Sequence, residues 1–103
     1  MRNERDVKEA VKKLFKKYGV WHYMIVPIAY SRTGVPDFIC CLRGKFFAVE
    51  TKYGYNKPKP RQVIEMEAIA KAGGDCFVIN EKNLDVLEGF LKGVANESID
   101  GSC

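Results

Sequence analysis

Two acidic residues stand beside short apolar segments, where strand packing alone would not place a charge. Asp37 precedes the run Phe38–Leu42, and Glu50 and Lys52 end the next apolar run. Residues two apart on a β-strand share a face, so Glu50 and Lys52 point the same way. If the two runs form a hairpin that turns at residues 43–45, Asp37 and Glu50 lie at nearly the same level. Two carboxylates held this close repel each other, which favours a divalent cation between them.

The chemistry of such a site follows from its ligands. Hard oxygen ligands suit Mg²⁺, which usually keeps several waters and takes only one or two carboxylates. The backbone carbonyl of Thr51 is a further candidate ligand. A bound cation would activate a water, and the Lys52 ammonium would orient that water or stabilise charge on a phosphate. The structural alternative is a surface ion pair between Glu50 and Lys52, with Asp37 capping a turn.

The charge of the chain favours a polyanionic partner. The net charge is +4, and residues 43–62 hold six basic residues against one acid, Glu50. A basic segment next to candidate chemistry is typical of nucleic-acid-binding proteins. An ordinary lysine-rich solvated surface is the alternative explanation.

Length and composition indicate one globular domain. The 103 residues suffice for one compact domain, which we assign to residues 1–93, followed by a polar tail over residues 94–103. No apolar run reaches the ~18–20 residues of a membrane span. We therefore expect a soluble intracellular protein, in the cytoplasm of a bacterial host if it is phage-encoded. The four cysteines form no Cys-x-x-Cys pair and His22 is the only histidine, which argues against a zinc site.

Periodicity and turn residues predict an α/β order of α-β-β-β-α-β-α. The middle strands are apolar on both faces, so we expect helices to cover both sides of the sheet. The second helix should turn Val63, Met66, Ile69 and Ala70 inward. The expected elements are a helix over Asn3–Tyr18, strands over Trp21–Ile28, Phe38–Leu42 and Lys45–Lys52, a helix over Pro60–Ala72, a strand over Cys76–Ile79 and a third helix with Leu84, Leu87, Phe90 and Leu91 as its apolar stripe.

Several motifs together resemble the signature of the PD-(D/E)xK nucleases. Within that superfamily the chain is most similar to the virus-type replication–repair nuclease (VRR-NUC) domain, in its stand-alone phage-like form. The similarity extends from the first helix to the segment Asn80–Leu84. The motifs are Gly34-Val35-Pro36-Asp37, Glu50-Thr51-Lys52, Asn56-Lys57-Pro58 and Gln62.

This resemblance implies a restriction-endonuclease-like core, a small mixed β-sheet flanked by helices. It further implies that Asp37 and Glu50 bind Mg²⁺ or Mn²⁺ and that Lys52 positions the attacking water. Gln62 would lie beside the site at the start of the second helix. An acid of the first helix usually approaches the metal, often through water. Glu4 and Glu9 are the candidates, and Glu4 is preferred because it lies three residues before the inward Val7.

The implied function is a metal-dependent DNA endonuclease of replication or repair, selective for branched DNA in the manner of a Holliday-junction resolvase. Such an enzyme would act as a homodimer, with no small-molecule cofactor and no membrane partner. A flap, nicking or restriction-like nuclease with the same site is one alternative, and a non-catalytic basic DNA-binding module is another. The candidate DNA contacts are Arg32, Tyr55, Lys57, Lys59 and Arg61.

Overall fold

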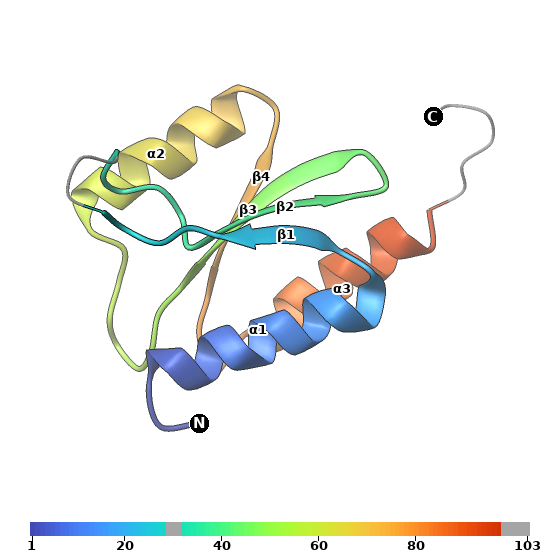
Figure 1. Ribbon diagram of the computed structural model, residues 1–103, viewed down its shortest axis with the longest axis horizontal. Coiled ribbons are helices and arrows are strands. Elements are labelled where there is room, and N and C mark those ends of the chain that lie inside the picture. Colours follow the sequence, from blue (N-terminus) through green and yellow to red (C-terminus); the bar gives the residue numbers. More distant parts are fainter. Residues whose placement is uncertain (29–31, 98–103) are drawn as a thin grey trace.

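A computed structural model describes residues 1–28 and 32–97. The elements follow the predicted order, and the four strands form one mixed sheet in the order β1-β2-β3-β4. Helices α1 and α3 lie on one face of this sheet and α2 lies on the other (Figure 1). The elements are α1 (Glu4–Tyr18), β1 (Trp21–Met24), β2 (Phe38–Leu42), β3 (Lys45–Thr51), α2 (Pro60–Lys71), β4 (Asp75–Ile79) and α3 (Leu84–Ala95).

The central hairpin sets the level of the candidate site. In the antiparallel pair β2–β3, Leu42 lies opposite Lys45, so Arg43 and Gly44 alone make the turn. Both turn residues have positive φ, 51° and 82°, as a tight hairpin turn that follows the strand twist requires. The same register places Phe38 opposite Val49. Strand β4 then pairs in parallel with β3 after the crossover through α2.

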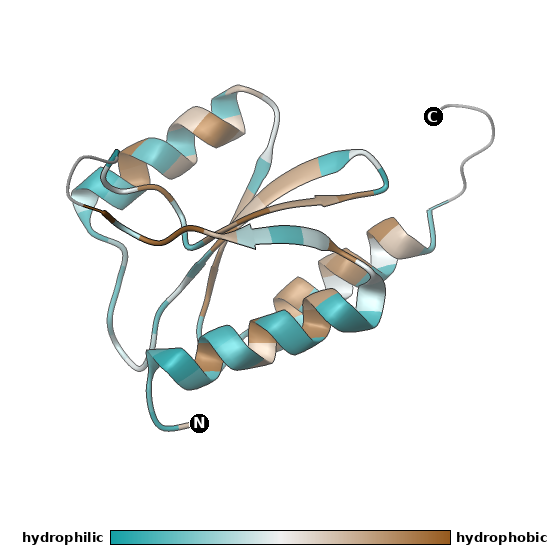
Figure 2. Ribbon diagram, viewed as in Figure 1, coloured by the Kyte–Doolittle hydropathy of each residue, from teal (hydrophilic) through white to brown (hydrophobic). Residues whose placement is uncertain are grey.

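The aromatic core lies between the sheet and the helices α1 and α3. The Phe15 ring of α1 meets Phe38 edge-on, with centroids 5.4 Å apart, and also contacts His22 at 4.9 Å. Phe47 continues this cluster toward Phe90 of α3. The buried stripe of α1 is Val7, Val11 and Phe15, and its outward surface is polar (Figure 2). The helix begins where the Asn3 side chain accepts a hydrogen bond from the Asp6 amide, which confirms the predicted N-cap.

Strand β1 is shorter than the predicted Trp21–Ile28 and ends at Met24. Its last paired residue, Met24, lies opposite Phe38, and one more backbone bond runs from the Ile25 amide to the Asp37 carbonyl. Beyond this point Pro27 and Pro36 lack the amide protons that would extend the ladder. The chain therefore leaves the sheet after Ile25 and enters it again at Asp37, just before β2.

Helices lie on both faces of the sheet, as expected, but α2 covers only part of its face. Val63 and Ala70 are exposed rather than inward, whereas Met66 and Ile69 are half-buried as α2 packs against β4. The buried residue of α2 is an acid, Glu65. The apolar residues of β1 and of the start of β3 on this face stay exposed.

Helix α3 extends to Ala95, and Val94 is buried in the core. The helix thus runs into the range assigned to the polar tail, and residues 98–103 of that range lie outside the described residues. No helix among residues 1–28 and 32–97 is long and apolar enough to cross a membrane. The described cysteines are free thiols, and burial raises the pKa of Cys40 to about 12, so this thiol is unreactive.

Candidate active site

Asp37 is held by the strand that carries Glu50. Asp37 Oδ2 accepts hydrogen bonds from the Thr51 amide at 2.9 Å and from the Thr51 hydroxyl at 2.6 Å. The Asp37 amide in turn donates to Glu50 Oε1 at 3.2 Å. Thr51 is fully buried, so its hydroxyl has a structural role that the sequence interpretation, which assigned only its backbone, did not foresee. These bonds engage Oδ2 and leave Asp37 Oδ1 without a hydrogen-bond donor among the described residues.

Glu50 is a buried carboxylate, 2% exposed, at the end of β3. Its Oε2 accepts a hydrogen bond from the Gln62 amide group at 2.7 Å and lies 3.1 Å from the Lys52 ammonium. Burial raises the pKa of Glu50, the nearby Asp37 charge raises it further, and Lys52 partly opposes both. Positive charge in addition to Lys52 would therefore favour the ionised form of Glu50.

Gln62 comes from the first turn of α2. Its Oε1 accepts a hydrogen bond from the Lys59 amide at 2.8 Å, which closes the N-terminus of the helix. This bond fixes the amide so that Nε2 faces Glu50. Lys52 is 11% exposed, and its ammonium lies on the same side as Glu50, as the two-residue spacing predicted. The structure thus brings together Asp37, Glu50, Lys52 and Gln62.

The first helix contributes Glu4 and a lysine that the sequence interpretation missed. Lys8 Nζ lies 3.5 Å from Glu4 Oε2 and 3.9 Å from Asp37 Oδ1. Glu9 instead pairs with Lys12 and is 57% exposed. Glu4 is therefore the helix acid on the side of the site, and it reaches Asp37 through Lys8. The four-residue spacing of Glu4 and Lys8 was the sequence signal for this pair.

The donor atoms fit a hard divalent cation. The carboxylates of Asp37 and Glu50 are close enough for the Asp37 charge to raise the pKa of Glu50, and Mg²⁺ commonly takes one or two carboxylates with water in its other positions. Over residues 1–28 and 32–97, no group of three or more His, Cys, Asp or Glu side chains gathers as a metal site. Asp37 Oδ1 accepts no hydrogen bond from the described residues, so it is the oxygen best placed to take a cation. Burial, and then the charge of Asp37, raise the pKa of Glu50, and a bound cation would favour its ionised form.

A basic segment follows β3 and leads to α2. Tyr55, Lys57, Lys59 and Arg61 are all exposed, and Tyr55 is 92% exposed. Glu81, from the turn after β4, anchors this segment by accepting the Gly54 amide at 3.0 and 3.2 Å. The segment therefore has a defined position beside the carboxylates.

Glu81 and Lys82, in the turn between β4 and α3, both contact the basic segment, and the sequence did not predict either contact. The Lys82 ammonium lies 4.7 Å from the centre of the Tyr55 ring, a cation–π contact. The Gly54–Glu81 bonds lower the pKa of Glu81 and keep its carboxylate ionised. Neither contact could be read from the sequence, because residues 27 positions apart meet only through the β3–β4 pairing.

Arg32 forms an ion pair rather than extending freely from the surface. Its Nη2 lies 2.9 Å from Glu65 Oε1, and its Nε donates to Glu65 Oε2. This bidentate pair neutralises the buried carboxylate of α2 and ties the segment before Asp37 to that helix. The Arg32 side chain is still 69% exposed, so its outer nitrogens remain accessible.

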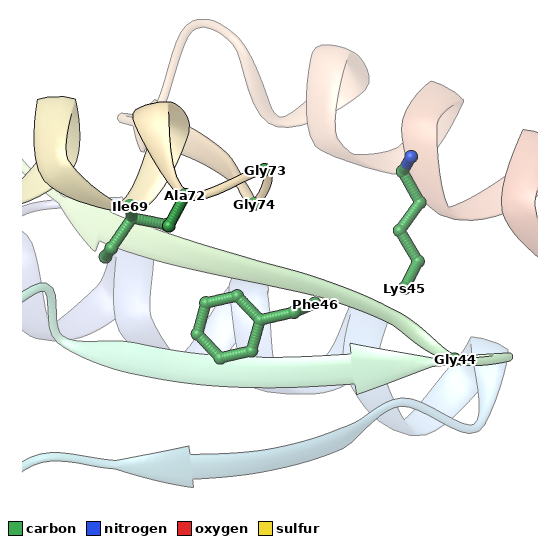
Figure 3. Close-up of a pocket in the computed structure, with 7 residues that line it drawn as sticks. All are labelled: Gly44, Lys45, Phe46, Ile69, Ala72, Gly73 and Gly74. Carbon is green, nitrogen blue, oxygen red and sulfur yellow. The ribbon is translucent and has the colours of Figure 1, made fainter.

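Two hollows mark the ends of the sheet face that α2 covers. One of about 200 Å³ adjoins Asp37 and Gln62 and has apolar walls that include Ile25 and Val35. Another of about 500 Å³ lies at the opposite end, between the β2–β3 turn and the end of α2 (Figure 3). The second hollow holds no acid, so the candidate chemistry belongs to the first end.

Comparison with solved structures finds two informative similarities. A structure titled "VRR_NUC domain" is 32% identical in sequence, with a TM-score of 0.71, and the match covers 82% of this chain and 91% of that one. Hjc, a Holliday junction resolvase from the archaeal hyperthermophile Archaeoglobus fulgidus, is 13% identical, with a TM-score of 0.57 over 76% of this chain and 69% of its own. At that identity the second likeness is one of fold. No protein-family model and no curated protein sequence matches the chain.

Proposed function

This chain belongs to the VRR-NUC family of PD-(D/E)xK nucleases, and from that premise we propose that it is a Mg²⁺- or Mn²⁺-dependent DNA endonuclease. The observation that carries the proposal is the meeting of Asp37 and Glu50 beside the Lys52 ammonium. The alternative of a surface ion pair is disfavoured, because Glu50 is 2% and Lys52 only 11% exposed. A buried pair with a second carboxylate next to it is unfavourable for stability alone.

The proposed reaction is hydrolysis of a phosphodiester. A bound divalent cation would supply Lewis acidity and lower the pKa of a water molecule. Asp37, Glu50 and the Thr51 carbonyl are the proposed ligands, with Glu4 acting through water. The Lys52 ammonium would hold the water in line with phosphorus or stabilise charge on the phosphate oxygens. The water oxygen bonds to phosphorus, one bridging P–O bond breaks, and the departing oxygen takes a proton.

DNA is the proposed substrate, read by shape and backbone. The exposed bases Lys57, Lys59 and Arg61 follow the site and would contact phosphates, while the exposed Tyr55 ring would stack on a base or sugar. Arg32 would add a contact through its outer nitrogens. We propose branched DNA, as in a Holliday junction, because the archaeal protein of the same fold is a junction resolvase.

A second copy of the chain is the proposed partner, because resolving a junction requires cuts in two strands. The sheet face that α2 leaves open offers an apolar surface for it. Trp21 lies opposite Cys41 and Cys41 opposite Phe46, so these side chains form a row across three strands. Trp21 and Tyr23 are 60% and 59% exposed, and Phe46 is 44% exposed where it faces the hollow beside Ile69 (Figure 3). We call Trp21, Tyr23, Cys41 and Phe46 the open sheet face.

A cleavage panel tests the function. Labelled four-way junction, flap, nicked duplex, plain duplex and single-stranded DNA are incubated with Mg²⁺, Mn²⁺ or EDTA. We expect metal-dependent cutting, fastest on the junction, and no cutting in EDTA. Asp37→Ala and Lys52→Ala should each abolish cleavage while DNA binding survives. Full activity in either variant would remove that residue from the site, and a flap or nick preference would identify a different nuclease.

If no DNA is cut, a calorimetric titration with Mn²⁺ separates the remaining explanations. If no substrate is cut and a calorimetric titration detects no Mn²⁺ binding, the chain is a DNA-binding module whose acids are structural. If Mn²⁺ binds but no DNA in the panel is cut, the metal site stands and the substrate class is wrong.

A further inference from the structure

Lys8 lies between two acids at the outer side of the site. Its ammonium is 3.5 Å from Glu4 Oε2 and 3.9 Å from Asp37 Oδ1. Asp37 Oδ2 is already engaged by both Thr51 donors, so Lys8 faces the oxygen that accepts no other described bond. The Lys8 side chain is 29% exposed, and its charge is therefore only partly screened by solvent.

Among the lysines of α1 that form ion pairs, Lys8 is the one that lies beside a carboxylate of the site. Lys12, one turn further along α1, pairs with Glu9, and Lys17 pairs with Glu88 of α3. Neither pair includes a carboxylate of the site. Glu4 precedes Lys8 by four residues, the favourable order for an ion pair on a helix, and this pair directs the ammonium toward Asp37.

Resting on the proposed function, we propose that Lys8 is the counter-ion of the metal-free site and competes with the divalent cation for Asp37 Oδ1. An ammonium near this oxygen lowers the free energy of the ionised carboxylates when no cation is bound. A divalent cation on the same oxygen repels the ammonium, which has to leave. The flexible four-carbon stem of lysine allows the ammonium to turn toward the surface.

This displacement couples metal binding to DNA binding. Once displaced, the ammonium adds a positive charge beside the cation, where the substrate phosphate must lie. Lys8 therefore weakens cation binding in the free protein and strengthens binding of the DNA backbone to the metal-loaded protein. Because such coupling is reciprocal, DNA should raise the affinity for the cation, and part of that increase should depend on Lys8.

Calorimetric titration of Mn²⁺ into the DNA-free protein tests the inference without an activity assay. Lys8→Met removes the charge and keeps much of the apolar stem, while Lys8→Arg keeps the charge. Lys12→Met is the matched control, because Lys12 lies one turn further along α1 and is 35% exposed. We expect Lys8→Met to bind Mn²⁺ about 3- to 10-fold more tightly than the unmodified protein. Lys8→Arg and Lys12→Met should stay within about twofold of it.

The outcomes separate this inference from the proposed function. Unchanged or weaker Mn²⁺ binding by Lys8→Met would overturn the counter-ion role, even if the unmodified protein binds the ion. No Mn²⁺ binding by the unmodified protein would overturn the metal-dependent function and this inference together. A thermal melt in EDTA gives a second readout: Lys8→Met should melt at a lower temperature than Lys12→Met and regain more on adding Mn²⁺. Equal Mn²⁺-induced shifts in the two variants would contradict the inference.

Discussion

Gln62 joins the start of α2 to Glu50, the buried acid of β3. Its Nε2 donates to Glu50 Oε2 over 2.7 Å, while its Oε1 accepts the Lys59 amide over 2.8 Å. One side chain thus closes the helix and satisfies a carboxylate in the site. Because the first bond fixes which end of the amide faces Glu50, the fold of α2 determines the hydrogen bonding of the candidate metal ligand.

Gln62→Ala should lower both stability and cleavage. It removes a hydrogen bond to a buried charge, so the free energy of unfolding in EDTA should fall by about 1 to 3 kcal/mol. Urea denaturation measures this loss, and cleavage of the preferred substrate should slow as Glu50 loses its orientation. Ile64→Ala, at a residue of the same helix that is 56% exposed, is the control and should change neither quantity. A Gln62→Ala protein as stable and active as the unmodified one would contradict this role.

The pair Arg32–Glu65 should contribute to stability independently of DNA. Glu65 is 6% exposed, so removing Arg32 leaves a nearly buried carboxylate without its partner. Solvent reaches most of Arg32, and we therefore expect a coupling of only about 1 kcal/mol in a double-mutant cycle of Arg32→Met and Glu65→Gln. Zero coupling, together with weaker DNA binding by Arg32→Met, would make Arg32 a phosphate contact alone.

The sequence was sufficient to predict the hairpin but not the contacts around it. Glu50 and Lys52 share a face by strand geometry, and the level of Asp37 follows from counting residues to the turn. The Phe38–Val49 register agrees with that count. Pro60 predicts the first helical position, which puts Gln62 in the first turn of a helix, and α2 begins at Pro60.

The missed features depend on how distant segments pack. Glu65 lies on a helix with weak apolar periodicity, so nothing local indicated that it would be buried or paired with Arg32, 33 residues away. In the sequence, Lys8 is one of several bases on a helix surface that is expected to be solvated, and only the packing of α1 places it beside Asp37. How much of the sheet face is buried also depends on the length and position of α2. The apolar pattern of a single strand does not give this information.

Trp21→Glu should convert the proposed dimer to a monomer. The substitution puts a charge on the open sheet face, at the edge strand β1, where burial against a second copy would leave it unpaired. Val86→Glu on α3, at a residue that is 53% exposed on another side of the molecule, is the control. Sedimentation velocity should give a dimer for the unmodified protein and for Val86→Glu. A dimer of unchanged affinity in Trp21→Glu would place the interface elsewhere.

Glu88 should make stability depend on pH. Its Oε2 accepts hydrogen bonds from the Lys17 ammonium and the Tyr18 hydroxyl, each 2.8 Å long, which link the end of α1 to α3. Lys17 and then Tyr18 lower the pKa of Glu88 in the folded protein. Ionised Glu88 therefore stabilises the folded protein above the unfolded-state pKa, about 4.3 for glutamate. This stabilisation is lost as the pH falls through the lower pKa of the folded state.

Thermal melts of Glu88→Gln measure this contribution. The variant should melt slightly below the unmodified protein at pH 7, and the difference should shrink as the pH falls below about 4. Glu67→Gln, at an exposed position of α2, should show no such difference at pH 7. A difference between Glu88→Gln and the unmodified protein that is the same at pH 7 and pH 3 would contradict the ionic origin of the link.

Gly34→Ala tests whether the chain before Asp37 needs its close approach to α2. A Cβ at Gly34 would lie 2.6 Å from Arg61 Cγ and 2.8 Å from the Arg61 carbonyl oxygen, and its φ is +82°. Gly44 has the same φ of +82°, but a Cβ there meets nothing within 4 Å. Gly44→Ala therefore carries the backbone strain alone, about 1 to 2 kcal/mol. Gly34→Ala should lose about 1 to 3 kcal/mol more, because the Arg61 backbone has to move.

The two variants should also differ in cleavage. Displacing Arg61 shifts the next residue, Gln62, and the strain at Gly34 lies three residues before Asp37, so both sides of the site lose their alignment in Gly34→Ala. Gly44 lies at the far end of the hairpin, and its variant should cut at the unmodified rate under conditions where it is fully folded. Equal losses of stability and activity in the two variants would mean that backbone conformation, rather than the contact with Arg61, requires glycine at position 34.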